Sequence, residues 1–470
     1  MTLGTADRPL RIAIIGAGPA GFYTAEALLK QKDLVCTIDF FNRFPTPFGL
    51  VREGVAPDHQ SIKAVIRVYD RIAANPQVRY FGNVTFGTDV THDELRPFYD
   101  QIVYAIGAQT DRRMGIPGEL LDGSHAATVF VGWYNAHPDY YTAEFDLSCE
   151  RAVIVGNGNV AMDVARILIT NPDELAKTDI ADHALEALRK NKVREVVMLG
   201  RRGPVQAAFT TPELKEFGEL EGVDILIDPK DMELDPLSAA AMAEDKVATR
   251  NVELLRTYAA RGATGAARTI HMRFFVSPVE LLGGDNGRVS AVRIEHNQLV
   301  PDGSGGMKAQ GLGTFETIEA GLVFRSVGYR GKPTPGVPFD EKRGVIPNDE
   351  GRVLTAAEGT AVLGEYAVGW IKRGPSGIIG TNKPDAVATV ERMLEDIPRL
   401  PGISEANRNL EAVPNFLRER QIKVVTYADW KTLDQHETSV GTAQGRPRVK
   451  VSTVDEMIDI IDHEKNNGAG

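Results

Sequence analysis

Two glycine-rich turns constrain this chain of 470 residues more than any other feature. The first lies in the segment IAIIGAGPAGFYTAEAL, and the second lies in AVIVGNGNVAMDVARIL. Each follows a short apolar run and precedes a segment of helical character, and this context makes such turns typical of dinucleotide-binding units. The first glycine makes the tight turn, and the second lets the backbone approach a pyrophosphate on the helix N-terminus. Two such turns predict two bound dinucleotides, and a protein that holds two usually moves a hydride between them.

The segments around the turns predict an α/β fold. All-apolar runs that end at glycine are typical of parallel strands covered on both faces. Strands are expected at 11–16, 34–41, 151–155 and 194–200, with helices at 19–31 and 159–169. Composition and periodicity also favour helices over 61–74 and 233–268, whereas alternation over 270–300 predicts antiparallel strands.

Two segments with one shared pattern define the expected domains. QIVYAIGA ends near Ala108 and GLVFRSVGYRG begins at Gly321, and both run from apolar residues to a small residue and a glycine. We interpret them as crossings between two Rossmann-like dinucleotide-binding domains, the second inserted into the first. The expected bounds are 1–108 with 324–470 for the first domain and 109–323 for the inserted domain.

Composition places the chain among soluble globular proteins, with 43% hydrophobic and 25% charged residues. No apolar run approaches the length of a membrane span, and the first residues lack the apolar core of a secretory signal. The two cysteines, Cys36 and Cys149, are far apart, so we expect no disulfide framework and a reduced cytoplasmic location. The net charge of −11 argues against general nucleic-acid binding.

The cysteines and histidines also exclude some kinds of chemistry. Because the sequence has no CxxC motif, a dithiol relay is disfavoured, and two distant cysteines cannot ligate an iron–sulfur cluster. The nine histidines show neither HxxxH nor HxH spacing, so no metal site is proposed.

The residues that end the strand after each turn bear on which dinucleotide is bound. An acidic residue about 20 residues beyond the turn normally binds the ribose. Asp39 is either a ribose ligand placed slightly early or a solvated strand residue, and Asn42 takes the usual position. In the second unit, Arg201 and Arg202 offer forked donors and positive charge, which favours the 2′-phosphate of NADP. A solvated basic turn is the alternative for this arginine pair.

Two further loops carry candidate site residues. The loop FNRFPTPFGLVREGVAPDHQSIK follows a strand at the sheet edge where ligands bind, and its His59 could relay a proton or only shape the loop. In VGWIKRGPSGIIGTNKPDAVATV, three glycines allow close backbone approach, and a helix N-terminus follows that favours the electron-rich edge of a flavin. Trp370 offers an aromatic surface there, although an isolated tryptophan would more often be core packing.

Taken together, these motifs resemble the adrenodoxin reductase family, the ferredoxin–NADP reductases of glutathione-reductase-like build, over nearly the whole chain. GAGPAG, PFGLVREGVAPDH, GNGNVAMDVAR, RRGP and GWIKRGPSGIIGTNK occur in the family's order, and the long motifs are far more specific than the glycine turns. DWKTLDQHE and GRPRVK resemble the family's C-terminal segment. The resemblance implies an FAD domain built from both ends of the chain and an NADP domain inserted within it.

The resemblance also implies site residues. Contacts to FAD are implied for Gly16, Gly18, Ala20, Leu50, Trp370, Gly377 and Ile379. Contacts to NADP are implied for Asn159, Val160, Arg201, Arg202 and Glu213. Neighbouring motif residues complete the cofactor-binding set: Pro19, Gly21, Asn42, Gly49, Val51, Gly107, Gly156, Gly158 and Ile378. In actinobacterial-type members a histidine and a glutamate near the flavin are linked to catalysis, and they match His59 and Glu216.

The implied activity is that of an NADPH–ferredoxin oxidoreductase. A hydride passes from NADPH to FAD, and single electrons then pass to a ferredoxin-type iron–sulfur protein, which could supply a cytochrome P450. One alternative is the flavoprotein component of a larger, glutamate-synthase-like oxidoreductase, although such relatives carry cysteine-ligated clusters that this chain lacks. The other is a non-catalytic, flavin-binding redox sensor. The family resemblance favours a monomer.

The expected partner sets a requirement on surface charge. Ferredoxins are generally acidic, so a chain of net negative charge needs a local basic patch to bind one. One candidate patch is the charged face of the helix predicted over 61–74, and the second lies on the helix predicted in the inserted domain. Their members are Lys63, Arg67 and Arg71 in the first patch and Lys246, Arg250 and Arg256 in the second. An ordinary solvated face is the alternative for each.

Overall fold

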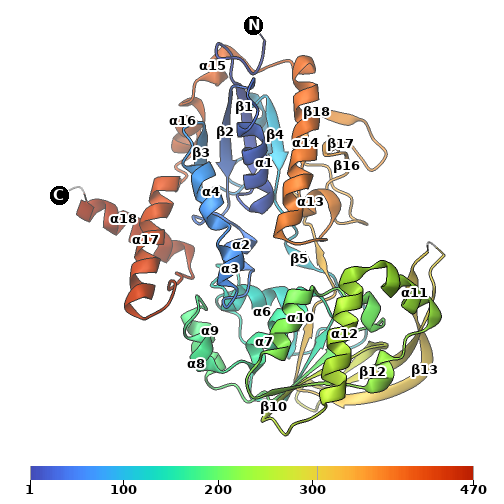
Figure 1. The fold of residues 1–470 in the computed structure, drawn as a ribbon. Coiled ribbons are helices and arrows are strands. Elements are labelled where there is room, and N and C mark those ends of the chain that lie inside the picture. Colours follow the sequence, from blue (N-terminus) through green and yellow to red (C-terminus); the bar gives the residue numbers. More distant parts are fainter. Residues whose placement is uncertain (1, 304, 469–470) are drawn as a thin grey trace. The chain divides into compact units, whose positions relative to one another are not determined.

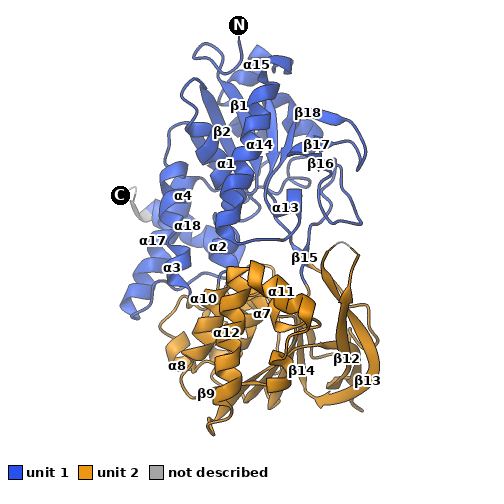
Figure 2. Cartoon of the chain, turned by 45° about the vertical axis from the view of Figure 1, so that its right-hand side comes forward, with its two compact units in different colours: residues 1–55, 59–110, 328–470 blue, residues 56–58, 111–327 orange. Residues whose placement is uncertain are grey.

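The computed structural model describes residues 2–303 and 305–468, and the chain forms two compact units (Figures 1 and 2). Unit 1 comprises the residues up to Val55, His59–Thr110 and the residues from Gly328 onward. Unit 2 comprises Ala56–Asp58 and Asp111–Val327. The expected α/β class with two Rossmann-like sheets is confirmed.

Unit 1 is built on a seven-stranded sheet of order β16-β17-β18-β4-β1-β2-β3. Strand β1 is apolar except for Arg11, and its alternate residues enter two separate cores, because the sheet is covered on both faces. β1 pairs in parallel with β2 and β4, and β4 pairs in parallel with β18. The strands of this sheet are β1 (Leu10–Ile15), β2 (Cys36–Phe41), β3 (Val78–Phe81), β4 (Gln101–Tyr104), β16 (Asn348–Asp349), β17 (Arg352–Leu354) and β18 (Ala361–Ala367). Two short strands, β5 (Thr110–Asp111) and β15 (Tyr329–Arg330), lie near the crossings.

The helices of unit 1 come from both ends of the chain. The longer ones are α1 (Pro19–Leu29), α4 (Ile66–Ala73), α14 (Asn382–Asp396), α16 (Ala412–Glu419), α17 (Tyr427–Ala443) and α18 (Val454–Gly468). Short helices are α2 (Leu50–Glu53), α3 (Gln60–Lys63), α5 (His92–Leu95), α13 (Trp370–Arg373) and α15 (Glu405–Arg408). Helices α1 and α14 lie side by side against one face of the sheet, although more than half of the sequence separates them (Figure 1).

Unit 2 contains a six-stranded parallel sheet of order β6-β14-β7-β8-β10-β9. A separate antiparallel sheet joins β11, β12 and β13. The strands are β6 (Ser124–Ala126), β7 (Arg151–Val155), β8 (Glu195–Leu199), β9 (Val223–Ile227), β10 (Arg268–Arg273), β11 (Val276–Gly283), β12 (Val289–Pro301), β13 (Met307–Glu319) and β14 (Leu322–Arg325). The helices are α6 (Ala127–Tyr134), α7 (Asn159–Ile169), α8 (Pro172–Leu175), α9 (Asp182–Leu188), α10 (Thr211–Gly218), α11 (Pro236–Glu244) and α12 (Lys246–Arg261).

Two expectations about elements need correction. The start of 270–300 is not antiparallel, because β10 lies between β8 and β9 in the parallel sheet, whereas β11 and β12 are antiparallel as expected. Alternating burial shows which face of a strand is covered and says nothing of its direction. The helix expected over 61–74 is two helices, α3 and α4, separated at Ala64–Val65. No helix in the described part of the chain combines the length and the apolar character needed to cross a bilayer.

Candidate cofactor sites

The first glycine turn lies between β1 and α1 in unit 1. Gly16 has φ of +103°, and a Cβ there would lie 2.6 Å from the carbonyl oxygen of Ala105, so only glycine fits. Pro19 opens α1, where its fixed φ suits the first helical turn. Gly21 packs the helix onto the turn, because a Cβ there would collide with the carbonyl oxygen of Gly16. At Gly18, in contrast, a Cβ would have no described atom within 4 Å, so this backbone faces open space.

A second loop faces this turn. Gly49, with φ of +49°, precedes α2, and a Cβ on it would lie 3.1 Å from Cα of Gly18. The preceding Phe48 has φ of +84°, a conformation that costs a bulky residue about 1–3 kcal/mol. Its N–H donates to the carbonyl of Ala17 at 2.7 Å, and its ring packs on Phe22, Tyr69 and Trp430. The aromatic cluster therefore holds a strained residue that brings Gly49 against the dinucleotide turn.

The N-termini of α1 and α14 converge at Gly369. A Cβ on Gly369 would lie 2.6 Å from Cβ of Ala20 in α1 and 3.3 Å from Oδ1 of Asn382 in α14. The N–H of Gly369 donates to Asp385 at 2.6 Å, which ties α14 to the end of β18. Two helix N-termini at one place favour negative charge there.

Apolar groups surround this polar cradle. Leu50 is 40% exposed and Ile378 is 59% exposed, which is unusual for large aliphatic side chains. Trp370 is half-buried, with its ring 5.2 Å from that of Tyr329 and its Nε1–H bonded to the carbonyl of Ser376. Val51 is fully buried, so it can offer a ligand only its backbone. Glycine-lined backbone, helix N-termini and exposed apolar side chains fit both the pyrophosphate and the ring system of FAD.

The remaining candidates of this set line the same loops. Gly107 follows β4 with φ of +71°, and a Cβ on it would have no described atom within 4 Å. Gly377 has φ of +80°, and its Cβ would collide with Thr381, so this position also requires glycine or a shift of that side chain. Ile379 is half-buried and packs against the core that also receives α1 and α14.

Asn42 bonds inward rather than presenting its amide to a ligand. Its Oδ1 accepts from the N–H of Ala17 at 3.2 Å, and its Nδ2 donates to the carbonyls of Phe44 and Thr46, both at 3.0 Å. Asn42 therefore joins the glycine turn to the loop after β2. Asp39 is neither a ribose ligand nor a solvated residue, because it is fully buried and bonded to Arg79 and to Tyr99. The sequence interpretation of Asp39 was wrong because position along a strand does not reveal a buried partner.

The second glycine turn lies between β7 and α7 in unit 2. Gly156 has φ of +128°, and a Cβ there would collide with the carbonyl oxygen of Ser326, so this position also requires glycine. Gly158 precedes α7, and Val160 packs against the core of the unit. Asn159 opens the helix, but its side-chain oxygen accepts from the N–H of Thr210 at 2.8 Å. Its side chain is thus engaged with the start of α10, while its backbone stays at the helix N-terminus.

Arg201 and Arg202 follow β8 next to this turn. Arg201 is exposed and Arg202 is half-buried, and Arg202 donates to the carbonyl of Gln206 at 3.3 Å. Burial lowers the pKa of Arg202, and the positive charge of Arg201 lowers it further. A cationic pair that is only partly neutralised by the protein fits a phosphate group.

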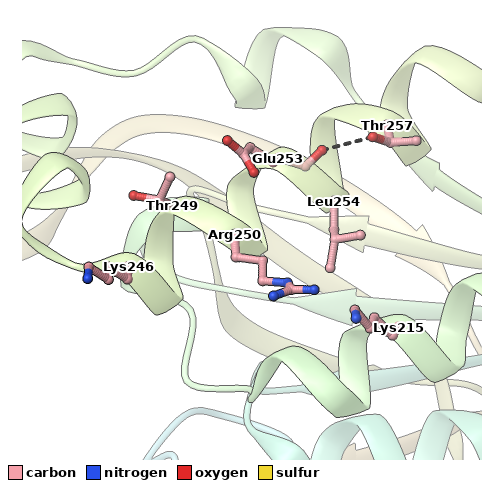
Figure 3. A pocket seen from close by; sticks show the side chains of 7 residues that line it. All are labelled: Lys215, Lys246, Thr249, Arg250, Glu253, Leu254 and Thr257. Carbon is pink, nitrogen blue, oxygen red and sulfur yellow. Dashed lines mark hydrogen bonds between the residues drawn. The ribbon is translucent and has the colours of Figure 1, made fainter.

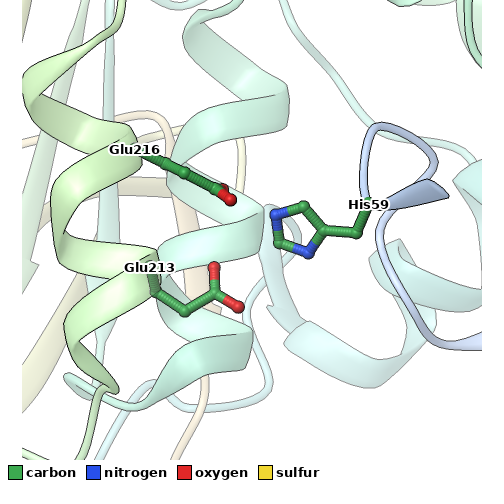
Figure 4. Close-up of side chains that lie close together, drawn as sticks. All are labelled: His59, Glu213 and Glu216. Atoms are coloured by element: carbon green, nitrogen blue, oxygen red, sulfur yellow. The ribbon is translucent and has the colours of Figure 1, made fainter. Parts of the chain in front are cut away.

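The two proposed catalytic residues belong to different units. Glu216 lies on α10 in unit 2, together with Glu213, and both carboxylates project from the same side of that helix (Figure 4). Glu213 is buried and Glu216 is partly exposed. His59, also drawn in Figure 4, is the buried residue that precedes α3 in unit 1.

Sequence reasoning missed the residue that contacts both glutamates. Arg166, on α7, is 3% exposed and approaches Glu213 at 3.3 Å and Glu216 at 3.4 Å. It also contacts Asp58 and Asp163, each at 2.7 Å. Burial alone would lower the pKa of Arg166, but the carboxylates of Asp163, Asp58 and Glu213 raise it well above the ordinary arginine value. The available signal was the pair of charged residues, Asp163 and Arg166, within the largely apolar helix segment NVAMDVARIL.

The structure changes the membership of the first basic patch. Lys63, expected on the charged face, is only 7% exposed, whereas the neighbouring Ile62 is 40% exposed. The expectation assumed one continuous helix, and the chain instead breaks between α3 and α4, so the three residues do not share one helical face. Arg67 and Arg71 on α4 are exposed as expected.

The second basic patch borders an open groove in unit 2. Lys246, Arg250 and Arg256 are all exposed on α12. Lys246 and Arg250 line a groove of about 580 Å³ between α12 and α10, where Lys215 adds a third cation and Glu253 contributes an acid (Figure 3). The groove is therefore predominantly basic.

Comparisons with known proteins identify relatives over the whole length. Residues 10–227 match the family model described as pyridine nucleotide-disulphide oxidoreductase. The chain is 48% identical over 462 residues to NADPH-ferredoxin reductase FprA of Mycobacterium tuberculosis, covering 96% of this chain and 99% of that protein. It is 41% identical over 464 residues to mitochondrial NADPH:adrenodoxin oxidoreductase of Arabidopsis thaliana, covering 96% and 95%. The solved structure of Mycobacterium tuberculosis FprA in complex with NADPH matches with a TM-score of 0.91 at 47% identity, covering 97% and 100%.

These relatives agree with the motifs and with the two Rossmann-like sheets. The sequence identity to these relatives is close to one half over almost the full length, and the fold is the same, so the family can be assigned. The chain belongs to the adrenodoxin reductase-like family of ferredoxin–NADP reductases.

Proposed function

We propose that unit 1 is the FAD-binding domain and unit 2 the NADP-binding domain of an NADPH–ferredoxin oxidoreductase. The enzyme is FAD-dependent, and NADPH is its electron donor. When bound, FAD accepts a hydride from NADPH and releases single electrons to a ferredoxin-type protein. The observation that carries this assignment is the pair of glycine turns, each with a position where a Cβ would strike a backbone carbonyl, at Gly16 and at Gly156.

In unit 1, the chain's own groups bind and orient the flavin cofactor. The backbone at Gly18 and Gly49, with the converging N-termini of α1 and α14, supplies N–H donors and positive potential for the pyrophosphate. Leu50, Trp370 and Ile378 supply apolar surface for the rings. Such fixed groups lower the barrier mainly by holding donor and acceptor in a reacting geometry.

In unit 2, charge selects the nucleotide. Arg201 and Arg202 bind the 2′-phosphate that distinguishes NADPH from NADH, while the N-terminus of α7 binds the pyrophosphate. Glu213 contacts the nucleotide, and Glu216 in unit 2 and His59 in unit 1 are each proposed to hold or move a proton. These roles rest on the family motifs and on the shared face of α10.

The partner is a ferredoxin-type one-electron carrier. We favour the groove beside α12 as its docking surface, because Lys215, Lys246 and Arg250 outnumber the acid Glu253 there. The exposed pair Arg67 and Arg71 on α4 is the second candidate. The protein is proposed to act as a monomer.

The decisive experiment mixes the purified protein anaerobically with NADPH, and separately with NADH, in a stopped-flow spectrometer. Bleaching of a flavin band that is much faster with NADPH supports the proposal. Equal bleaching rates with NADPH and NADH would still identify a flavoenzyme but would overturn the proposed roles of Arg201 and Arg202. A protein that shows no flavin band after reconstitution with FAD would refute the proposed function.

A further inference from the structure

Side chains on one face of α7 contact α10 along its length. Asn159, Asp163 and Arg166 are spaced i, i+4 and i+7, so they lie along a single side of α7. Asn159 bonds to Thr210, the residue before α10, and Arg166 contacts Glu213 and Glu216, one and two turns further along. The helix that begins at the dinucleotide turn thus sets the position of the helix that carries the two glutamates.

Arg166 commits its donors to carboxylates. Its Nε bonds to Asp58 at 2.7 Å, and one terminal nitrogen bonds to Asp58 at 3.0 Å and to Asp163 at 2.7 Å. The other terminal nitrogen approaches Glu213 and Glu216. A guanidinium has five N–H groups in a rigid fork, and four of its hydrogen bonds here go to Asp58, Asp163 and Glu213, while Glu216 lies within ion-pair distance.

Four carboxyl groups surround this one guanidinium. They belong to Asp58, Asp163, Glu213 and Glu216, and all four lie within ion-pair distance of Arg166. Carboxylates at close range repel one another, and the positive guanidinium offsets this repulsion. The guanidinium therefore favours an arrangement in which the two carboxylates on α10 point toward α7. Arg166 is therefore more than a helix-packing residue, because its guanidinium gathers acidic groups from three separate segments of the chain.

We infer that Arg166 is a positioning residue of the NADPH site, which fixes Glu213 and Glu216 of α10 relative to the pyrophosphate-binding end of α7. The inference rests on the proposed function, since it assigns Arg166 a role through two glutamates proposed to serve NADPH. Asp58, which directly precedes His59 in the chain, is held by the same guanidinium.

The primary test compares Arg166→Lys and Arg166→Met with the wild type in NADPH-dependent flavin reduction. Lysine keeps the charge but presents its donors from one atom, so it cannot span four carboxyl groups. The rate at saturating NADPH should fall about 10- to 100-fold in Arg166→Met and less in Arg166→Lys, as expected for misplaced groups. Arg151→Lys is the matched control, because Arg151 pairs with Glu195 in the same unit at a partly exposed site, and its rate should equal that of the wild type.

A double-mutant cycle separates positioning from general stability. If Arg166 acts through Glu216, adding Arg166→Lys to the Glu216→Gln variant should lower the rate of flavin reduction about threefold or less. In the wild-type background, Arg166→Lys should lower the same rate by a larger factor. Fully multiplicative losses, or an unchanged rate in Arg166→Lys, would overturn the inference. Should Arg166→Met fail to retain FAD or its circular dichroism spectrum, the cycle with Arg166→Lys decides. Bleaching of the flavin band of the wild-type protein by NADPH shows independently whether the proposed function holds.

Discussion

His92 lies in a chain of hydrogen bonds within unit 1. Its Nε2 is 2.8 Å from Glu365 Oε1, and the hydroxyl of Tyr104 donates to the other oxygen of that carboxylate at 2.9 Å. The bond to Glu365 is the main cause that raises the pKa of His92 to about 8. The folded protein therefore favours the charged form of this histidine.

This raised pKa predicts a pH-dependent stability. Because the folded pKa exceeds the ordinary value of 6.5, the contribution is fully present below pH 6.5 and is lost as pH rises through about 8. His92→Gln should lower the free energy of unfolding by about 1–2 kcal/mol at pH 6 and by much less at pH 9. Urea titrations at both pH values measure this, and Glu365→Gln should show the same trend. Equal losses at the two pH values would contradict the assignment.

Arg201 and Arg202 carry a second prediction at the scale of single residues. Each hydrogen bond to a charged group contributes about 1.5–3 kcal/mol, so losing both arginines should reduce the preference for NADPH over NADH by about 100-fold or more. The double variant Arg201→Ala/Arg202→Ala is compared with the wild type by kcat/KM for each nucleotide. The KM for NADH should change little, and an equal loss with both nucleotides would exclude recognition of the 2′-phosphate.

The sequence indicates where some of these residues lie and conceals the contacts of others. The place of Arg201 and Arg202 after a strand could be predicted from the sequence, and their role in binding NADPH stays a prediction. The inward bonding of Asn42 and the burial of Asp39 could not, since both depend on groups brought together by the fold, such as Tyr99. The role of Arg166 stayed hidden for the same reason.

Among the elements, α2 depends on a distant helix for its position. Arg52 of α2 forms two bonds to Glu437 of α17, at 2.8 and 2.5 Å, and both side chains are buried. Arg448 also bonds to Glu437 at 3.0 Å. Burial by itself raises the pKa of Glu437, but the two arginines hold it below the ordinary glutamate value. The loop that carries Gly49 is thereby joined to the C-terminal part of the chain.

Removing one partner of the buried Arg52–Glu437 ion pair should lower the free energy of unfolding substantially. Glu437→Gln leaves Arg52 and Arg448 without their shared carboxylate, so we expect a loss of about 3–5 kcal/mol in the free energy of unfolding. The double variant Arg52→Met/Glu437→Met should recover part of this loss, because it removes the unpaired charge as well. Chemical denaturation of the FAD-loaded protein provides the measurement, and a loss below about 1 kcal/mol in Glu437→Gln would show that the pair is not tightly coupled.

Strands could be predicted correctly from the sequence where the pattern of apolar residues is compatible with a single type of secondary structure. The apolar runs at 11–16 and 151–155 are strands within one residue of the expected bounds, since few other structures bury both faces of so short a segment. The direction of β10 and the break after α3 were missed, because pairing partners and local breaks depend on tertiary contacts. The convergence of α1 and α14 also lies beyond sequence periodicity, as it joins segments far apart in the chain.

At the scale of the whole molecule, an acidic protein must attract a generally acidic partner. The net charge of −11 repels such a partner at long range, so a local basic patch has to guide the encounter. The groove beside α12 and the exposed pair on α4 offer two such patches. Their contributions can be separated by reversing charge in one patch at a time.

The pair Lys246→Glu/Arg250→Glu should raise the apparent KM for ferredoxin about tenfold and flatten its dependence on salt. Arg67→Glu/Arg71→Glu tests the patch on α4 in the same assay. Reduction of ferricyanide by NADPH is the control and should be unchanged in both variants, because the small anion does not need the docking surface. A patch whose reversal leaves the KM for ferredoxin unaltered is not the docking site.

The discontinuous build of unit 1 affects how a nascent chain can fold. Strand β4 pairs with β18 in a register that joins Ile102 to Glu365, so roughly 260 residues must leave the ribosome between the two partners. At ordinary rates of synthesis this takes roughly 10 to 50 s, during which the edge of β4 that later pairs with β18 has no partner strand. Unit 2 is almost contiguous and is fully synthesised by Val327, so it can fold while unit 1 still waits for its second half. Until β18 is made, the first hundred residues therefore present an unpaired strand edge, which is the kind of surface that chaperones protect.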